Sequence, residues 1–181
     1  MSTIRIYTDH DITNLLFTSD NQDHIRERLN AAGVRFEQWQ TRSELAPGAS
    51  PDDVISAYRA DIDRLMNDDG YQTVDVVSLS SDHPQKAELR QKFLSEHTHS
   101  EDEVRFFVGG EGLFSLHIGE QVFEVLCQQG DLISVPANTP HWFDMGENPD
   151  FIAIRLFNNP AGWVANFTGS TIADRFNRLE N

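Results

Sequence analysis

The sequence predicts a mainly β protein, a barrel or sandwich of short strands with a few helices in its N-terminal half. From Phe93 onward, short runs of β-branched and aromatic residues follow one another closely, with Gly and Pro between them, which is typical of sandwiches and barrels. Before Phe93, two stretches carry apolar residues at the three- and four-residue spacing of helices. The 181 residues are enough for one domain with a substantial core.

The first half of the chain is expected to alternate strands and helices. Residues 1–8 form a short strand, and residues 20–32 form a helix that stops at a glycine. Residues 34–39 alternate apolar and polar side chains, as a half-buried strand does. A serine-proline pair at residues 50–51 begins a second helix, which is expected to run to Gly70.

The second half is expected to be mostly strands. Residues 74–79 and residues 151–157 are β-prone. Residues 85–91 are expected to form a short helix after the first of these strands and before the barrel region that starts at Phe93. Residues 113–118 and 121–126 flank a Gly-Glu dipeptide, a two-residue connection of the hairpin type. Turns are expected where Gly and Pro occur, at residues 109–110, 112, 119–120, 129–130, 136, 146 and 149.

The composition excludes some classes of partner. The formal net charge of −15 disfavours binding to nucleic acid or to an anionic membrane surface. No apolar run reaches the roughly 18 residues of a membrane span, and residues 1–7 lack the apolar core of a signal peptide. We therefore expect a cytoplasmic monomer with neither a nucleic-acid nor a membrane partner. The single cysteine, Cys127, lies in an apolar run and is expected to be a buried thiol.

Two imidazoles and one carboxylate lie close together in the sequence, at His97, His99 and Glu103. In an extended backbone, side chains two residues apart project from the same face, so both histidines can reach one point. Glu103 joins them if the polar residues between them turn or bulge. An isolated His-x-His is usually a surface feature, but the apolar run at residues 104–108 would draw this cluster toward the interior of a sheet. These three residues are therefore candidate metal ligands.

A fourth candidate ligand, His141, follows a stretch punctuated by Gly and Pro. Three imidazole nitrogens and one carboxylate suit borderline divalent metals such as iron, nickel, manganese, cobalt or zinc, and disfavour calcium and magnesium. The other histidines have no partner at ligand spacing. His10, His24 and His83 are expected to lie at the surface, and His117 is expected to be a hydrogen-bonded histidine within a sheet.

The two histidine-containing segments resemble the paired metal-binding motifs of the cupin superfamily. The first reads His97-x-His99-x3-Glu103-x6-Gly110, and the second reads Gly130-x5-Pro136-x-Asn138-x2-His141. This sequence departs from the general pattern at Asn138, where glycine is usual, and at Met145, where asparagine is usual. Neither departure removes a ligand.

More specifically, residues 92–108 and 134–146 are very similar to the bacterial acireductone dioxygenases, and a weaker similarity extends over nearly the whole chain. The resemblance implies a cupin-type double-stranded β-helix, or jelly-roll barrel, in a single domain of residues 1–181. Within it, residues 1–92 would decorate the barrel with helices and strands, residues 93–157 would form the metal-binding barrel core, and residues 158–181 would form a C-terminal tail.

The resemblance also implies an activity. Members of this family use one iron(II) or nickel(II) ion per chain to cleave, with dioxygen, an ene-diol ketone that carries a methylthio tail, in methionine salvage. The iron form would give the keto acid of that pathway and formate, and the nickel form would give a shorter acid, formate and carbon monoxide. The metal ligands would be His97, His99, Glu103 and His141.

Further residues receive roles from the same resemblance. Arg105 would help to form the substrate dianion, and we expect it to matter to turnover and little to metal retention, because it has no lone pair to donate. Glu96 would support the neighbouring ligands. Since sulfur packs well on aromatic edges, the side chains expected to line a slot for the thioether tail are Phe93, Phe107, Phe143 and Trp163, with Arg155 as a second cation near the mouth.

Two other functions remain open at this point. A metal-dependent sugar isomerase or epimerase could use the same four ligands without oxygen, but it would need a pocket rich in groups that bind hydroxyls or phosphate. A cupin could also bind metal and ligand without turnover. Oxygen uptake with a synthetic ene-diol would distinguish the dioxygenase from both.

Overall fold

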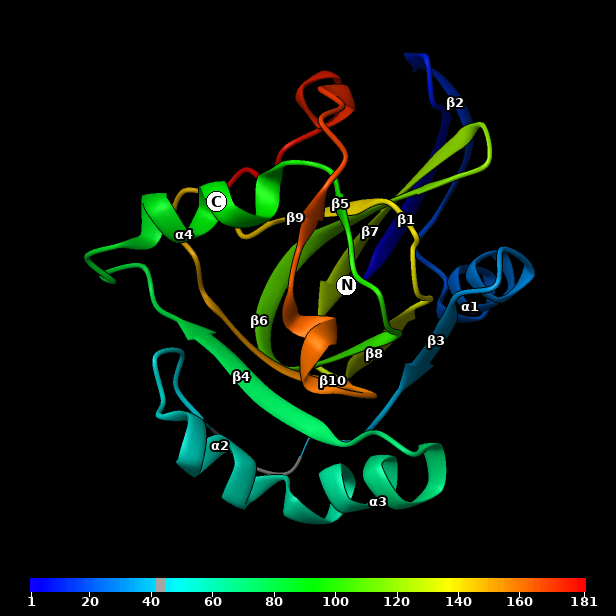
Figure 1. The fold of residues 1–181 in the computed structure, drawn as a ribbon. Helices are drawn as coiled ribbons and strands as arrows, with labels where there is room; N and C mark the ends of the chain where they lie inside the picture. The colour runs from blue at the N-terminus through cyan, green and yellow to red at the C-terminus, as the bar shows by residue number, and fades with distance from the viewer. Residues whose placement is uncertain (42–44) are drawn as a thin grey trace.

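The computed structural model describes residues 1–41 and 45–181, and it is mainly β, as the sequence predicts (Figure 1). Antiparallel strands curl around a central core to form a cupin-type barrel, and helices lie on its outside. The strands are β1 (Thr3–Thr8), β2 (Asp11–Ser19), β3 (Arg35–Gln38), β4 (Thr73–Leu79), β5 (His97–Thr98), β6 (Glu103–Ile118), β7 (Gln121–Gln128), β8 (Asp131–Val135), β9 (His141–Asp144), β10 (Phe151–Phe157) and β11 (Asn166–Phe167).

The long strand β6 connects the two sides of the barrel. Its first half pairs with β8 and β10, and its second half pairs with β7 and β9. The prediction that residues 109–110 and 112 form turns is wrong, because β6 runs through all three glycines. The register against β10 shifts beside Gly109, and Gly110 has a φ of 63°. A Cβ at Gly110 would lie 1.7 Å from the Asp150 carbonyl oxygen. The glycines therefore bend the strand from one sheet into the other without ending it.

The helices begin and end near the expected residues, with one difference. Asn21 caps α1 (Gln22–Ala31), and Ser50 caps α2 (Pro51–Ala57). The second helix was expected to be continuous, but it breaks at Tyr58 before α3 (Arg59–Asp69). The Tyr58 ring is fully buried and packs edge-on against Phe106 at 5.7 Å, so the residue at the break belongs to the core. The short helix α4 (Lys86–Leu94) completes the set, and none of the helices in the described part of the chain could cross a bilayer.

Strand β2 was not anticipated from the sequence. It lies at the edge of the sheet beyond β1, and most of its side chains are exposed. An edge strand with little burial lacks the alternation of apolar and polar residues that reveals a half-buried strand. The hairpin of β6 and β7 around Gly119-Glu120 is present, with Ile118 paired to Gln121, and Cys127 is a buried free thiol, as expected.

The apolar core has two main parts. One fills the barrel, and includes Phe107, Phe114 and Phe143. The other lies between the outer face of β4, β6 and β10 and the helices α2 and α3, which Figure 1 shows beneath that sheet. The start of β6, from which Glu103 projects, is therefore covered on its outer face by this second part of the core.

Gly112→Ala is expected to lower the free energy of unfolding by about 1–3 kcal/mol, the usual cost of overpacking a core. A Cβ at this position would lie 2.3 Å from Cζ of the buried Phe143 ring, and that ring is itself held by Phe93, Phe107, Phe114 and Phe151. Urea unfolding measures the change. The matched control is Gly109→Ala, on the same strand, whose Cβ would meet only the flexible end of Ile152 at 3.3 Å. Equal losses in both variants would contradict this account.

Candidate metal centre

Three histidine side chains converge inside the barrel. His97 lies in β5 and pairs with His141 of β9, and His99 follows β5 directly. One nitrogen from each ring can be chosen such that all three lie within 4.8 Å of one another. The three residues are only 1–5% exposed. The two-residue spacing places His97 and His99 together, and the pairing of β5 with β9 adds His141, which lies more than 40 positions later in the sequence.

Backbone carbonyls fix the orientation of all three imidazoles. Nδ1 of His97 lies 2.7 Å from the Ser95 oxygen, and Nδ1 of His141 lies 2.8 Å from the Thr139 oxygen. Nδ1 of His99 lies 3.0 Å from the Val164 oxygen. A carbonyl oxygen can only accept, so each Nδ1 carries the proton and each Nε2 keeps a free lone pair. This is the usual arrangement behind metal-binding histidines.

Glu103 directs one carboxylate oxygen toward the same point. Its Oε2 lies 3.2 Å from Nε2 of His99 and 3.7 Å from Nε2 of His141. Oε2 of Glu103 and Nε2 of His141 are both buried and have no hydrogen-bond partner. Buried polar atoms without a partner are rare, and here they are a carboxylate oxygen and an imidazole lone pair facing each other. The four predicted ligands therefore meet as a donor set that fits a borderline divalent cation.

Burial favours the neutral form of two of these imidazoles, those of His141 and His97. It lowers the pKa of His141 to about 3 and also lowers the pKa of His97. Burial would by itself raise the pKa of Glu103, but nearby positive charge, led by Arg105, outweighs that effect and holds this pKa well below its ordinary value. Neutral imidazoles and an ionised carboxylate are the protonation states that a metal requires, so protons compete weakly for the site.

The metal-free protein is expected to lose stability as the pH falls below about 6.5, the ordinary pKa of histidine. Below that pH the unfolded chain binds a proton at His141 that the folded chain does not bind until about pH 3. The free energy of unfolding should therefore fall by about 1.4 kcal/mol per pH unit from this residue, and His97 adds to the same slope. Urea unfolding of the apoprotein between about pH 7 and 5 measures it. An unchanged slope in His141→Gln would contradict the assignment.

Arg105 lies directly behind Glu103. Its Nε and Nη2 donate to Glu103 Oε1 at 3.0 and 2.6 Å, and its guanidinium lies 4.9 Å from the centroid of the Phe114 ring and 4.7 Å from that of Phe143. The residue is 3% exposed. Because Arg105 holds Oε1, the other oxygen of Glu103 is the one left to face the histidines.

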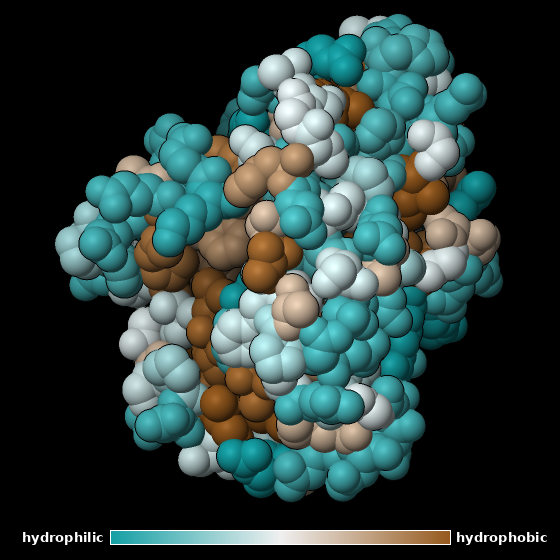
Figure 2. Space-filling view, viewed as in Figure 1, coloured by the Kyte–Doolittle hydropathy of each residue, from teal (hydrophilic) through white to brown (hydrophobic). Residues whose placement is uncertain are grey.

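A cavity of about 650 Å³ opens beside the histidine cluster. Its walls come from β4, α4, β5, β10 and the segment around β11, and they are mostly apolar. Figure 2 shows this apolar surface as a brown, furrowed band that runs from below α4 toward β4. The predicted pocket residues that line the cavity are Phe93, Arg155 and Trp163. Phe107 and Phe143 belong instead to the buried core, where Phe143 contacts the Arg105 guanidinium.

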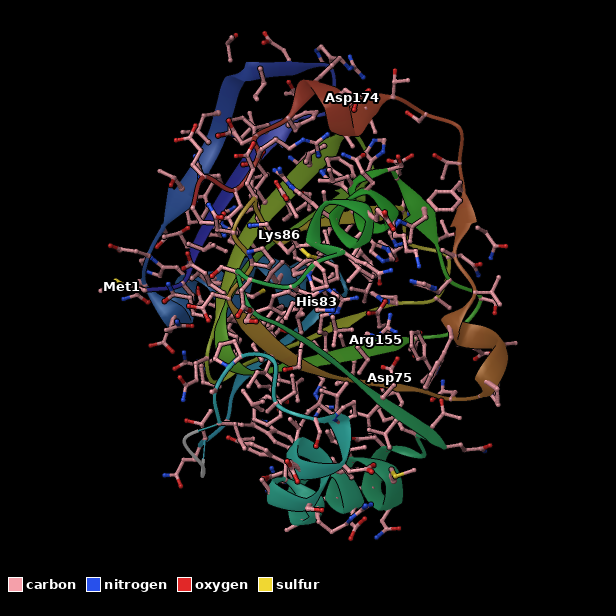
Figure 3. The ribbon with its side chains drawn as sticks, turned by 90° about the vertical axis from the view of Figure 1, so that its left-hand side faces the viewer. Met1, Asp75, His83, Lys86, Arg155 and Asp174 are labelled. Carbon is pink, nitrogen blue, oxygen red and sulfur yellow. The ribbon has the colours of Figure 1, made fainter. Side chains whose placement is uncertain are left out.

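Arg155 is paired with a carboxylate that the sequence analysis did not single out. Its Nε and Nη2 donate to Asp75 Oδ1 and Oδ2 at 2.9 and 2.5 Å, and Figure 3 shows the two side chains together where β10 runs beside β4. The sequence did contain a sign of this ion pair, because Asp75 lies within the apolar run 74–79. A carboxylate inside such a strand usually accompanies a buried cation.

Glu96 faces away from the histidine cluster. One oxygen accepts from Thr168 Oγ1 at 2.8 Å, and the other lies 2.8 Å from His117 Nδ1. His117 also contacts Asp9 through Nε2 at 3.1 Å, so it is a hydrogen-bonded sheet histidine, as predicted. Glu96 therefore links β5 to β6 and to the segment after β11. It positions the backbone that carries His97.

Comparisons with known proteins identify the family of this chain. The family model described as "ARD/ARD' family" matches residues 3–165. The chain is 70% identical over 151 residues to the acireductone dioxygenase of Alcanivorax borkumensis, covering 83% of both chains. It is 60% identical over 183 residues to that of Pseudomonas fluorescens, covering both chains completely. The solved acireductone dioxygenase from Bacillus anthracis, with a cadmium ion in its active centre, superposes with a TM-score of 0.78 at 31% identity, covering 92% of this chain and 98% of that one. This chain therefore belongs to the ARD/ARD′ family, the acireductone dioxygenases.

Proposed function

We propose that this chain cleaves an ene-diol ketone carrying a methylthio tail, using dioxygen and one iron(II) or nickel(II) ion, as a step of methionine salvage. One observation carries the proposal. Two buried ligand atoms without hydrogen-bond partners, Oε2 of Glu103 and Nε2 of His141, face each other beside the lone pairs of His97 and His99. If these residues bound no metal, both buried atoms would have neither a hydrogen-bond partner nor a coordinated ion.

The four side chains would hold the metal through three nitrogens and one oxygen. When bound, the metal supplies a Lewis acid and a template, because four protein ligands leave two positions of an octahedral ion for two adjacent substrate oxygens. The cadmium ion in the active centre of the Bacillus anthracis relative supports a divalent cation in this place. The donor set admits iron and nickel alike.

The residues around the four ligands would bind the substrate and hold Glu103 and β5 in position. The apolar cavity beside His97 and His99 would hold the methylthio tail, with the rings of Phe93 and Trp163 on its walls. Arg105 fixes Glu103 through Oε1 and places a buried positive charge beside the site where the substrate anion would lie. Glu96 keeps β5 in place from the other face.

The cavity disfavours the sugar isomerase or epimerase. Such an enzyme needs many groups that bind hydroxyls or phosphate, whereas most of these walls are aliphatic or aromatic, among them Val76, Val77, Leu79, Leu89, Phe93, Trp163 and Phe167. Oxygen uptake with a synthetic ene-diol separates the dioxygenase from both the isomerase and a binding protein without turnover.

Exchange of the metal is expected to change the products. Both metals should fill the site and give folded protein, because three imidazoles and a carboxylate exclude neither. We expect the iron form to release the keto acid and formate, and the nickel form to release the shorter acid, formate and carbon monoxide. The apoprotein is reloaded with each metal separately, and the gas phase is assayed for carbon monoxide. Unloaded apoprotein is the control and should consume no oxygen. Identical products from both forms would contradict the product assignment while leaving the ligand set untouched.

A further inference from the structure

The cavity beside the metal centre is free of acidic residues in a strongly acidic protein. The chain carries 29 Asp and Glu residues and a net charge of −15. None of the described residues that line this cavity is Asp or Glu. By contrast, the cleft between α4 and the C-terminal residues is lined by Glu147, Asp174 and Glu180. The cavity beside the candidate metal centre thus differs in charge from the cleft beside α4, in the direction that admits an anion.

Two of the cations near the cavity are already neutralised by carboxylates. Arg155 lines the cavity, but both of its donating nitrogens bind Asp75. Arg105 lies deeper and binds Glu103. Each of these guanidiniums therefore forms a local ion pair, which attracts a distant anion weakly.

Lys92 is different. It is exposed, lies in the last turn of α4 and contributes to the cavity rim. Within the described part of the chain it forms no ion pair, even with Glu88, which is four residues earlier on the same helix. Leu89 and Phe93 line the cavity from the same helix, and residues three and four apart share a helix face. Lys92 therefore places a cationic side chain with no carboxylate partner among the described residues on the side of α4 that borders the cavity.

The proposed substrate matches that charge. An ene-diol conjugated with a ketone is a vinylogous carboxylic acid, so it is an anion at neutral pH. We infer that Lys92 attracts this anion to the cavity mouth and raises its local concentration before it reaches the candidate metal centre. The inference rests on the proposed function. A cation at the rim acts on association and on its salt dependence more than on the chemical step.

A lysine in the last turn of a helix also stabilises the helix dipole, and the experiment must separate this role from capture. The variants are Lys92→Gln, Lys92→Glu and Lys92→Arg. The matched control is Lys86→Gln, which removes the same charge from the same helix. Nζ of Lys86 donates instead to the Ser81 oxygen at 2.8 Å and to Asn148 at 3.2 Å. Oxygen uptake gives kcat and KM at low and high ionic strength, and anaerobic titration of the nickel-loaded protein with the ene-diol gives Kd without turnover.

Lys92→Gln should lower kcat/KM and raise Kd by roughly 3- to 10-fold at low salt, and Lys92→Glu should have a larger effect, within the range that electrostatic steering spans. The loss should shrink at high salt, kcat should stay within about twofold, and Lys92→Arg should resemble the wild type. Lys86→Gln should match the wild type in all of these.

Three results would overturn the inference: an unchanged Kd in Lys92→Gln, an equal effect of Lys86→Gln, or a fall in melting temperature with no change in salt dependence. Wild-type protein that binds the ene-diol through Lys92 without consuming oxygen would overturn the proposed function alone. Wild-type protein that does not bind the ene-diol would overturn both.

Discussion

His141→Ala is expected to abolish turnover because the protein no longer retains its metal. His141 is 1% exposed, and its Nε2 has no partner within the described protein. Its removal leaves at most three ligands. The affinity for metal should fall by more than the roughly 100-fold that loss of a group behind a ligand costs. Elemental analysis after dialysis, together with oxygen uptake, measures both effects.

Two further variants keep this experiment interpretable. His141→Gln retains most of the side-chain volume against Phe114, onto which the imidazole stacks at 5.5 Å, so it guards against a folding defect in His141→Ala. His10→Ala is the matched control, because this histidine has a side chain 76% exposed and lies outside the cluster. Full metal content with normal oxygen uptake in His141→Gln would exclude His141 as a ligand.

Arg105→Ala is expected to impair both turnover and metal retention. The sequence favoured an effect on turnover alone, but the two hydrogen bonds from Arg105 to Oε1 of Glu103 change that expectation. Without them, Glu103 loses its orientation, and an unpaired buried carboxylate typically destabilises a fold by about 3–5 kcal/mol. Turnover should fall by about 10²- to 10³-fold, as when one fixed donor to developing charge is removed.

Measurements at saturating metal separate the two effects of Arg105. If Arg105 acts only through Glu103, excess metal should restore turnover. If its charge also favours the substrate anion, the fully loaded variant should stay slow. Arg105→Lys keeps the charge but loses the two-nitrogen contact, so it should recover part of the turnover and less of the metal affinity. Wild-type metal content and wild-type turnover in Arg105→Ala would contradict both roles.

The clustering of His97, His99 and Glu103 could be expected from the sequence because it depends on local geometry. His97 and His99 share a strand face by their spacing, and apolar residues after Glu103 signal burial. The sequence offered His141 as a fourth candidate, but nothing in the spacing of residues 99–141 specifies that β5 and β9 are neighbours. The resemblance to a known pair of motifs was what joined the two segments. Long-range pairing is set by the whole fold and not by adjacent residues.

The features that were missed have the same origin. Gly110 reads as a turn residue, and it acquires its role as a bend only because β10 crosses beside it. Tyr58 reads as part of a continuous helix, and its contact with Phe106 of β6 is a long-range one that helical spacing does not reveal. Phe107 and Phe143 were expected to line the pocket, but both rings lie in the core behind the cavity wall. The sequence shows that a ring is apolar, but it does not show how far that ring lies from the cavity.

The carbonyl contacts of the three histidines span very different lengths of chain, which matters while the chain is being synthesised. His97 and His141 are oriented by oxygens only two residues away, at Ser95 and Thr139, so their own loops set them as soon as those loops form. His99 depends on the Val164 oxygen, 65 residues later in the chain. A nascent chain that has emerged through residue 150 therefore contains all four predicted ligands, yet the imidazole of His99 still lacks the carbonyl that orients it. A site built from these four residues is thus complete only in the nearly finished polypeptide.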